Sequence, residues 1–267
     1  MSPIVSVIIP TTTQGFSHLA RLMPMLVEEC ENSNAEIIVI DNASRDGTCN
    51  YLSNYNCTII VNKTNLGFSK ANNQAARIAQ GKYLLFLNND TVVTDGFINK
   101  MKSTFDIKEL GKYAVGAVGC LIMEMGGQKK VQNIGVCFTK DYVSYPLGAE
   151  QSDISPQILF NDPRVHTIRE VPAVTAACMM VKKDMFLSIG GFDEEYINGW
   201  EDNDLCLRIR EDGWRIMYNG NAMIYHQRYG SKAVGRFNHE QENRQRYDSI
   251  WVDTGRAKKI LGEFREA

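Results

Sequence analysis

The chain has 267 residues, 44% of them hydrophobic, and its 29 basic and 31 acidic residues give a formal net charge of −2. This length allows a substantial core in one large domain, alone or with an appendage. The near-equal numbers of basic and acidic residues give no support for a nucleic-acid partner, which would need a basic surface. No segment approaches the ~20 consecutive apolar residues of a membrane span, and the N-terminus lacks the basic leader of a signal peptide.

The seven cysteines are scattered through the sequence, and no two of them form a CxxC pair. An odd and scattered set is typical of reduced thiols, not of a disulfide framework or a zinc site. We therefore expect a cytoplasmic protein.

The first half alternates strand and helix patterns. Strands are expected at Ile4–Pro10, Ala35–Asp41, Cys57–Asn62 and Lys82–Asn88. Helices are expected at Gly15–Cys30, Ser44–Tyr55 with Ser44 as a possible N-cap, and Gly67–Gly81. This alternation predicts βαβ units and a parallel sheet, whose ligands bind at the carboxyl ends of the strands. Polar or turn-forming residues occupy those ends at Pro10, Thr11, Asp41 and Asn88 to Asp90.

The second half is less regular. Strands are expected at Tyr113–Met123 and Val131–Phe138, and a loop from about Thr139 to Glu170. A strand, a short helix and a glycine turn are expected within 171–196, followed by a helix within 200–214 that ends at Gly213. One or two strands that end at His226 come next. The charged tail is expected to contain a last helix near 257–266.

A buried strand, Tyr83–Leu87, runs into the polar sequence Asn88-Asn89-Asp90. A carboxylate at a strand end can bind a divalent cation that in turn binds a diphosphate, and the neighbouring amides can contact a ribose or a phosphate. The alternative is an ordinary turn, because Asn and Asp are common turn residues. Taken alone, this segment favours the turn.

Two further segments suit a nucleotide. Asp41 can accept the N3–H of uracil or thymine, or it can cap the following helix. The loop of Asn65 and Gly67 enters a helix, where Gly67 permits close backbone approach and the helix N-terminus suits an anion. Lys70 either reaches a phosphate or is simply solvated.

The segment NGWEDNDLCLRIREDGW places Glu201, Asp202 and Asp204 in the first turn of a helix beside Trp200. The helix dipole favours acids there by ~0.3–1 kcal/mol each, so capping explains part of the pattern. Because Leu205 and Ile209 are expected to dock the helix, Asp202 can point into a cleft from a rigid support, as a general base requires.

His226 ends the last strand, and a lone histidine is more often structural than a ligand. With Asp90 as a metal ligand, its imidazole becomes a credible partner. From its composition, the segment Gln227–Ser231 is a further hypothesis: a lid over phosphates, with Arg228 as its cation. No GxGxxG, GxxxxGK[ST] or GxSxG sequence is present, so the common dinucleotide, P-loop and hydrolase sites have no support.

In this order, the segments resemble the family 2 glycosyltransferases, inverting enzymes of the GT-A fold, and the rhamnosyltransferase-like branch most of all. The resemblance covers about Ile4 to Ser231. It rests on VSVIIPTTTQ, IIVIDNASRDGT, NLGFSKANNQAARIAQGKYLLFLNND, the segment that ends in EDNDLCLRIREDGW, and IYHQRYGS. One position departs from the family pattern: the first Asp of its DxD motif is Asn88, which puts strict metal dependence in doubt.

The resemblance implies an α/β fold with a Rossmann-like, mostly parallel central sheet flanked by helices and a smaller acceptor-side sheet. It implies a GT-A domain over 1–231, divided into a nucleotide-binding half (1–120) and an acceptor-side half (121–231), and a C-terminal helical extension over 232–267. The implied reaction moves a sugar from a UDP- or dTDP-linked donor to a glycan or lipid-linked hydroxyl, with Mn²⁺ or Mg²⁺.

The implied roles are as follows. Asp202 is the general base, Asp90 and His226 hold the metal, and Trp200 and Glu201 border the acceptor. The donor contacts are Pro10, Thr11, Asp41, Asn65, Gly67, Lys70, Asn88, Asn89 and Asp90. Rival classes are a sugar nucleotidyltransferase and a non-catalytic sugar-nucleotide-binding domain. Peripheral contact of the tail with the inner membrane face, a homo-oligomer and a longer parent chain stay open.

Overall fold

The computed structural model describes residues 2–13, 15–107, 114–126, 129–148, 157–227 and 239–264. Its strands are β1 Val5–Thr11, β2 Ala35–Asp41, β3 Thr58–Val61, β4 Tyr83–Leu87, β5 Thr91–Val93, β6 Val115–Glu124, β7 Val131–Phe138, β8 Ser144–Gly148, β9 Ile168–Glu170, β10 Cys178–Lys182 and β11 Arg215–His226. Its α-helices are α1 Phe16–Ser33, α2 Thr48–Leu52, α3 Gly67–Ile78, α4 Phe97–Ser103, α5 Lys183–Ser188, α6 Glu201–Glu211, α7 Glu240–Tyr247 and α8 Arg256–Leu261.

The central sheet has the strand order β3-β2-β1-β4-β10-β6-β11-β5. β1 pairs in parallel with β2 and β4, β2 with β3, and β6 with β11, whereas β10 is antiparallel to both of its neighbours. The predicted mostly parallel α/β sheet is therefore confirmed. All five residues of β4 are buried, as the apolar run Tyr83–Leu87 predicts for a central strand.

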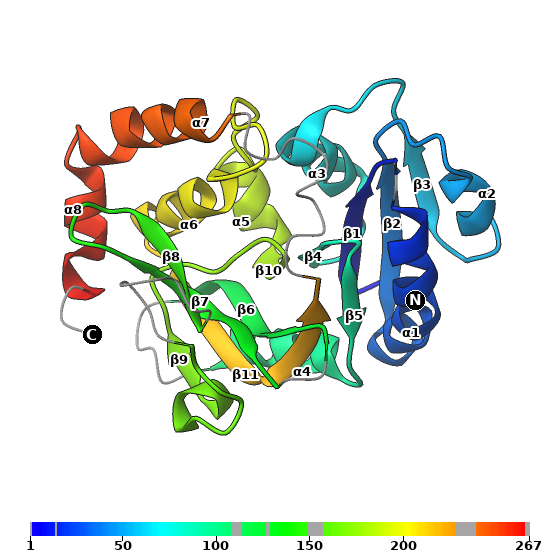
Figure 1. Ribbon diagram of the computed structural model, residues 1–267, viewed down its shortest axis with the longest axis horizontal. Helices are drawn as coiled ribbons and strands as arrows, with labels where there is room; N and C mark the ends of the chain where they lie inside the picture. Colours follow the sequence, from blue (N-terminus) through cyan, green and yellow to red (C-terminus); the bar gives the residue numbers. More distant parts are fainter. Residues whose placement is uncertain are drawn as a thin grey trace.

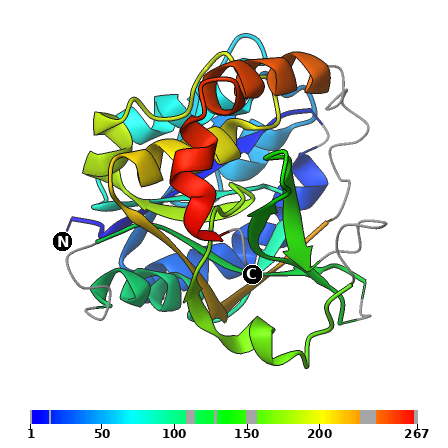
Figure 2. The same cartoon turned by 90° about the vertical axis from the view of Figure 1, so that its left-hand side faces the viewer.

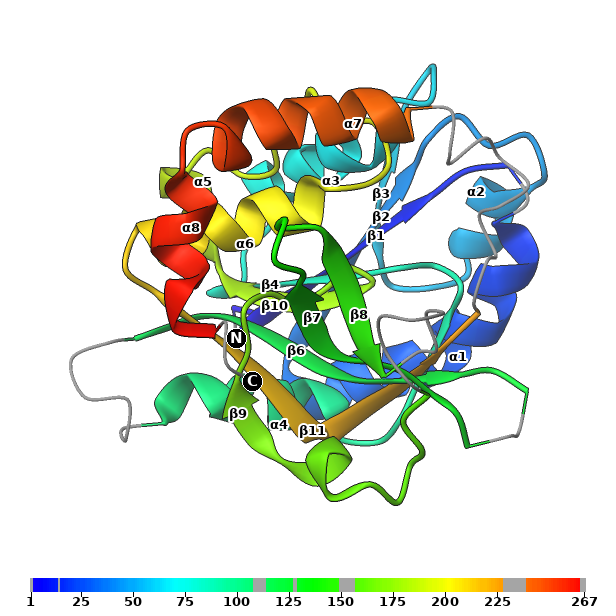
Figure 3. The same ribbon diagram turned by 60° about the vertical axis from the view of Figure 1, so that its left-hand side comes forward.

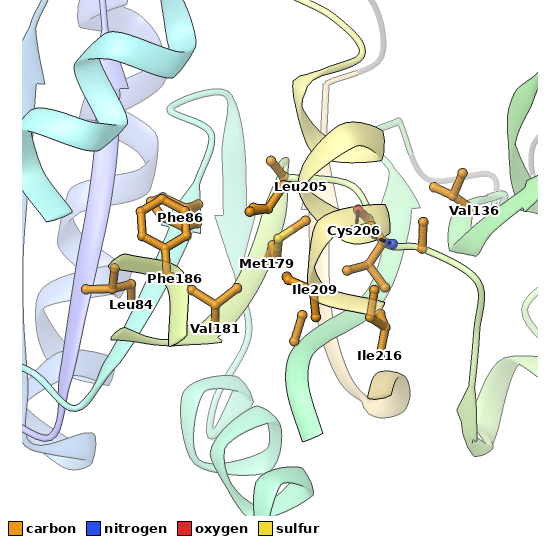
Figure 4. Close-up of a cluster of buried hydrophobic side chains, with 14 of the residues drawn as sticks. Leu84, Phe86, Val136, Met179, Val181, Phe186, Leu205, Cys206, Ile209 and Ile216 are labelled. Carbon is orange, nitrogen blue, oxygen red and sulfur yellow. Dashed lines mark hydrogen bonds between the residues drawn. The ribbon is translucent and has the colours of Figure 1, made fainter. Parts of the chain in front are cut away.

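Alternate residues of the strands point into two separate cores, because successive side chains of a strand face opposite sides. Val5, Val7 and Ile9 of β1 pack with α1 and α4 on one face. Ile8 faces the other side, toward α3, α5 and α6. In Figure 1, α3, α5 and α6 lie along the upper side of the sheet and α4 along its lower side. Figure 4 shows Leu84 and Phe86 of β4 beside Phe186 of α5, within the core that α6 also covers.

β7 and β8 form an antiparallel branch that leaves the central sheet at the carboxyl-terminal half of β6 (Figure 3). The expectation of a loop from Thr139 to Glu170 was wrong where β8 and β9 form. Both strands are short, and Pro146 lies in β8. A proline cannot donate a backbone hydrogen bond, so it is tolerated in an edge strand but hides the strand pattern in the sequence.

The C-terminal residues add an outer layer over α6, formed by α7, a π-helical turn at Asp248–Val252 and α8 (Figure 2). Helical structure was expected across this extension, but only α8 was predicted as a separate helix, near 257–266. Its buried side chains join residues of the domain in what we call the C-terminal apolar cluster: Tyr142, Tyr196, Leu207, Tyr247, Trp251, Ala257 and Leu261. The apolar side of this segment is thus packed against the domain. None of the helices in the described part of the chain combines the length and the apolar character that crossing a membrane requires.

Candidate functional site

A cavity of about 220 Å³, which we call the strand-end cavity, opens at the carboxyl ends of β1 and β4. Its lining residues are Pro10, Thr11, Thr12, Asn42, Asn65, Gly67, Phe68, Asn88, Asn89, Asp90, Thr175, Ala176, Ala177, Asn198, Glu201, Asp202 and His226. Because β10 is antiparallel to β4, with Cys178 opposite Leu87, the residues before β10 reach the same edge of the sheet. The cavity is therefore built from both halves of the chain.

Asp90 and His226 meet because β5 pairs antiparallel with the end of β11, which puts His226 opposite Thr91. Asp90 Oδ1 lies 3.1 Å from His226 Nε2, and Gln227 N donates to the Asp90 carbonyl over 3.0 Å. Burial acts to raise the pKa of Asp90, but the hydrogen bond and charge of His226 outweigh it, so the net pKa is below its ordinary value. The lowered pKa favours the ionised carboxylate, the form that binds a cation.

The other contacts of His226 test whether these two residues suit a divalent metal. His226 Nδ1 lies 2.9 Å from Gln132 Oε1, and the amide Nδ2 of Asn88 lies 3.3 Å from His226 Nε2. Nδ1–H can donate to Gln132 whether or not Nε2 carries a proton, so a cation can take the place of the Nε2 proton between His226 and Asp90. The pair therefore fits a metal ligand set. Among the described residues, no group of three or more His, Cys, Asp and Glu side chains gathers for a metal, so other ligands must complete the coordination.

Asp202 enters the cavity from the first turn of α6. Its Oδ2 accepts from Ala176 N over 3.2 Å, and its Oδ1 accepts from Asn203 N over 2.9 Å. These two backbone donors fix the carboxylate plane, and each oxygen keeps a lone pair for another proton. Leu205 and Ile209 are fully buried and dock α6, as predicted. The arrangement suits proton abstraction from a group in the cavity.

Amide side chains shape the opposite wall. Asn89 Nδ2 donates to Thr11 Oγ1 over 2.9 Å, which joins the ends of β4 and β1. Asn42 Nδ2 donates to the Gly67 carbonyl over 3.2 Å, and Asn65 Oδ1 accepts from Gly67 N over 2.9 Å. Gly67 has a φ of 79°, a backbone conformation that suits glycine. Among the described residues, this wall offers backbone and amide groups and no side-chain cation in the cavity lining.

Three of the predicted site residues lie outside the lining. Both Asp41 oxygens accept local hydrogen bonds, Oδ1 from Ser44 N and Oδ2 from the Cys49 thiol, each within 2.8 Å. Lys70 is exposed on α3, and Trp200 packs against Tyr247 with 4.9 Å between ring centroids and 45° between ring planes. Their roles toward a ligand stay predictions, and Arg228 with its proposed lid lies outside the described residues. Ser44 does not cap α2, because that helix begins only after Gly47.

The sequence did not identify several lining residues or the supporting Gln132. The missed lining residues are Thr12, Asn42, Phe68, Thr175, Ala176, Ala177 and Asn198. Asn42 and Asn198 could have been predicted from the sequence, since each is a polar residue within four positions of a predicted site residue. The segment 175–177 could not be predicted in this way, because its position in the cavity depends on the antiparallel direction of β10.

Comparison with known proteins gives the family. A model of glycosyl transferase family 2 matches residues 6–149, more than half of the chain, and a model described as the N-terminal domain of galactosyltransferase matches residues 163–242. The O-antigen biosynthesis protein RfbC of Myxococcus xanthus is 28% identical over 241 residues, which are 87% of this chain and 18% of that protein. The rhamnosyltransferase WbbL of Escherichia coli is 28% identical over 164 residues, 57% of each protein.

Among solved structures, GalNAc-T7 with UDP, GalNAc and Mn²⁺ aligns with a TM-score of 0.64 at 16% identity, covering 85% of this chain and 44% of that one. The fold is thus the GT-A arrangement of a glycosyltransferase. The chain belongs to glycosyl transferase family 2, and the predicted family and fold are confirmed. The chain spans only a fifth to a quarter of the first two curated relatives, at 18% and 25% of their lengths.

Proposed function

We propose that this protein is an inverting glycosyltransferase that moves a sugar from a UDP- or dTDP-linked donor to a hydroxyl of a glycan or lipid-linked acceptor. One observation carries the proposal: Asp202 and the pair Asp90–His226 line the same cavity. A base and a leaving-group site must face each other across the anomeric carbon for in-line displacement. Similarity to RfbC and WbbL favours a role in polysaccharide biosynthesis, and WbbL favours rhamnosyl transfer.

In this mechanism Asp202 removes the proton of the acceptor hydroxyl, whose oxygen attacks the anomeric carbon as the bond to the diphosphate breaks. Asp90 and His226 would hold Mn²⁺ or Mg²⁺, whose charge stabilises the leaving diphosphate. Mn²⁺ accompanies UDP in the GalNAc-T7 structure, which supports this choice. Asn88, in place of a carboxylate, makes the bound diphosphate a larger contributor to metal affinity.

The remaining residues bind the two substrates. Asp41 would read the pyrimidine through the lone pairs left beside Ser44 N and the Cys49 thiol. Glu201 and Trp200 would border the acceptor, with Glu201 in the cavity lining. The remaining donor contacts in this proposal are Pro10, Thr11, Asn65, Gly67, Lys70, Asn88 and Asn89.

A panel of nucleotide sugars tests the proposal directly. Thermal shift with and without Mn²⁺ should show stabilisation by one donor and its nucleotide, and stronger stabilisation with the metal. Incubation with that donor and candidate acceptors should release nucleoside diphosphate and a product of inverted configuration. Pyrophosphate release would instead favour a nucleotidyltransferase. Donor binding without transfer or hydrolysis would favour a non-catalytic domain.

A further inference from the structure

The segment Ile197–Trp200, which leads into α6, has an unusual backbone. Asn198 and Trp200 have φ values of 53° and 74°, and Gly199 between them has a φ of 137°. A left-handed conformation costs a residue other than glycine roughly 1–2 kcal/mol, so the surrounding structure must hold this loop. The next residues are Glu201 and Asp202, so the path of the loop fixes where α6 starts.

One side chain of the C-terminal layer holds this loop. Asn243 of α7 is 3% exposed, and its Oδ1 accepts from Ile197 N over 3.1 Å. Its Nδ2 donates to the carbonyls of Ile197 and Gly199 over 2.9 and 3.0 Å. Asn243 thus forms hydrogen bonds with three backbone groups of the loop. Tyr247, one turn further along α7, packs against Trp200.

The loop connects these contacts to the strand-end cavity. Asn198 lines the cavity, and its Oδ1 accepts from Phe68 N, at the start of α3, over 3.3 Å. Asp202 lines the cavity from the first turn of α6 and accepts from Ala176 N. The loop therefore lies between α7 on one side and two walls of the cavity on the other.

We infer that Asn243 is a positioning residue for sugar transfer, because it fixes Ile197–Trp200 and so holds Asn198 and Asp202 in the cavity. This inference rests on the proposed function. It gives the C-terminal helices a role in the reaction as well as in stability. Thr11 and Asn65, two of the proposed donor contacts, belong to other segments, so sugar transfer should depend on Asn243 more than donor binding does.

The test compares Asn243→Ala and Asn243→Asp with Leu261→Ala. Asn243→Asp keeps an oxygen that can accept from Ile197 N, but it loses the amide group that donates to the carbonyls of Ile197 and Gly199. Leu261 is buried in the same C-terminal apolar cluster, on α8, and serves as the control for lost stability. Both Asn243 variants should lower kcat by about 10- to 100-fold, since small misplacements of reacting groups have effects of that size. The KM for the donor should stay within about twofold.

Hydrogen exchange gives a readout that does not depend on activity. The amides of Ile197 and Phe68 should exchange about tenfold faster or more in Asn243→Ala, and at the wild-type rate in Leu261→Ala. Equal kcat in wild type and Asn243→Ala, or an equal loss of kcat in Leu261→Ala, would overturn the inference. Should the wild type transfer no sugar, the proposed function fails, and the two amides alone decide whether Asn243 holds the loop. Unchanged exchange at both amides would then refute that role.

Discussion

The carboxylate of Asp90 and the imidazole of His226 lie 3.1 Å apart, although they follow different strands in opposite halves of the chain. The antiparallel pairing of β5 with β11 brings them together, and Gln132 of β7 fixes the ring from its other side. Asp202 lines the same strand-end cavity as this pair. The predictions below follow from these contacts.

Replacing Gln132 should weaken metal binding although Gln132 touches no metal. Without its Oε1, the Nδ1 side of His226 loses its partner and the ring loses its fixed orientation. We expect Gln132→Ala to reduce the affinity of the nucleotide-bound protein for Mn²⁺ by about 10- to 100-fold, and His226→Ala to reduce it further. Titration calorimetry with Mn²⁺ in the presence of UDP measures both effects.

Gln80→Ala is a suitable control for these variants, because Gln80 is an exposed glutamine outside the cavity lining. It should bind Mn²⁺ as the wild type does. An unchanged Mn²⁺ affinity in His226→Ala would remove His226 from the metal site altogether.

Replacing Asp202 by asparagine should abolish transfer while nucleotide binding stays near normal. The amide keeps the size of the carboxylate but cannot take the acceptor proton, and loss of a positioned base typically lowers the rate by ~10²–10⁴-fold. Initial rates of UDP release with acceptor, and the Kd for UDP, give the two quantities. Asp212→Asn, at the exposed end of the same helix, is the matched control. Turnover near the wild-type rate in Asp202→Asn would exclude it as the base.

Asn88→Asp should strengthen metal binding. The side chain of Asn88 already lies 3.3 Å from His226 Nε2, so an introduced carboxylate would add a negative oxygen beside Asp90. We expect the Kd for Mn²⁺ to fall several-fold and to depend less on bound nucleotide. Asn89→Asp adds the same charge one residue along, where the amide contacts Thr11 instead, and should change the Kd less. Equal or weaker Mn²⁺ binding in Asn88→Asp would contradict this account of the altered motif.

The sequence was sufficient for the elements that carry a clear pattern. The apolar run Tyr83–Leu87 predicted a central strand, and the spacing of Leu205 and Ile209 predicted how α6 docks. These patterns are local, since they record which face of one element is buried. Residues at predicted strand ends then supplied six of the seventeen lining residues: Pro10, Thr11, Asn88, Asn89, Asp90 and His226.

The parts that the sequence did not predict depend on pairing between distant segments. β5 has three residues, too few for a recognisable strand pattern, yet its register places Asp90 beside His226. α7 is almost wholly polar and shows no apolar stripe, so the sequence pattern did not predict that Asn243 is buried. Such contacts depend on tertiary packing and not on local propensity.

The hydrogen bond between Asp41 and Cys49 makes the cysteine a reporter for the carboxylate. Burial first, and then the hydrogen bond and charge of Asp41, raise the pKa of Cys49 to about 11, so little thiolate is present near neutral pH. Removing the charge with Asp41→Asn should lower that pKa. The rate of Cys49 alkylation at a fixed, mildly alkaline pH should therefore rise, which peptide mass spectrometry measures.

Cys57 is the internal control for this experiment. Its pKa is raised by burial alone, with no carboxylate involved, so its alkylation rate should be the same in wild type and Asp41→Asn. A rise at both cysteines would indicate general loosening of the fold instead of a local charge effect. No change at Cys49 would mean that Asp41 does not hold its carboxylate against the thiol.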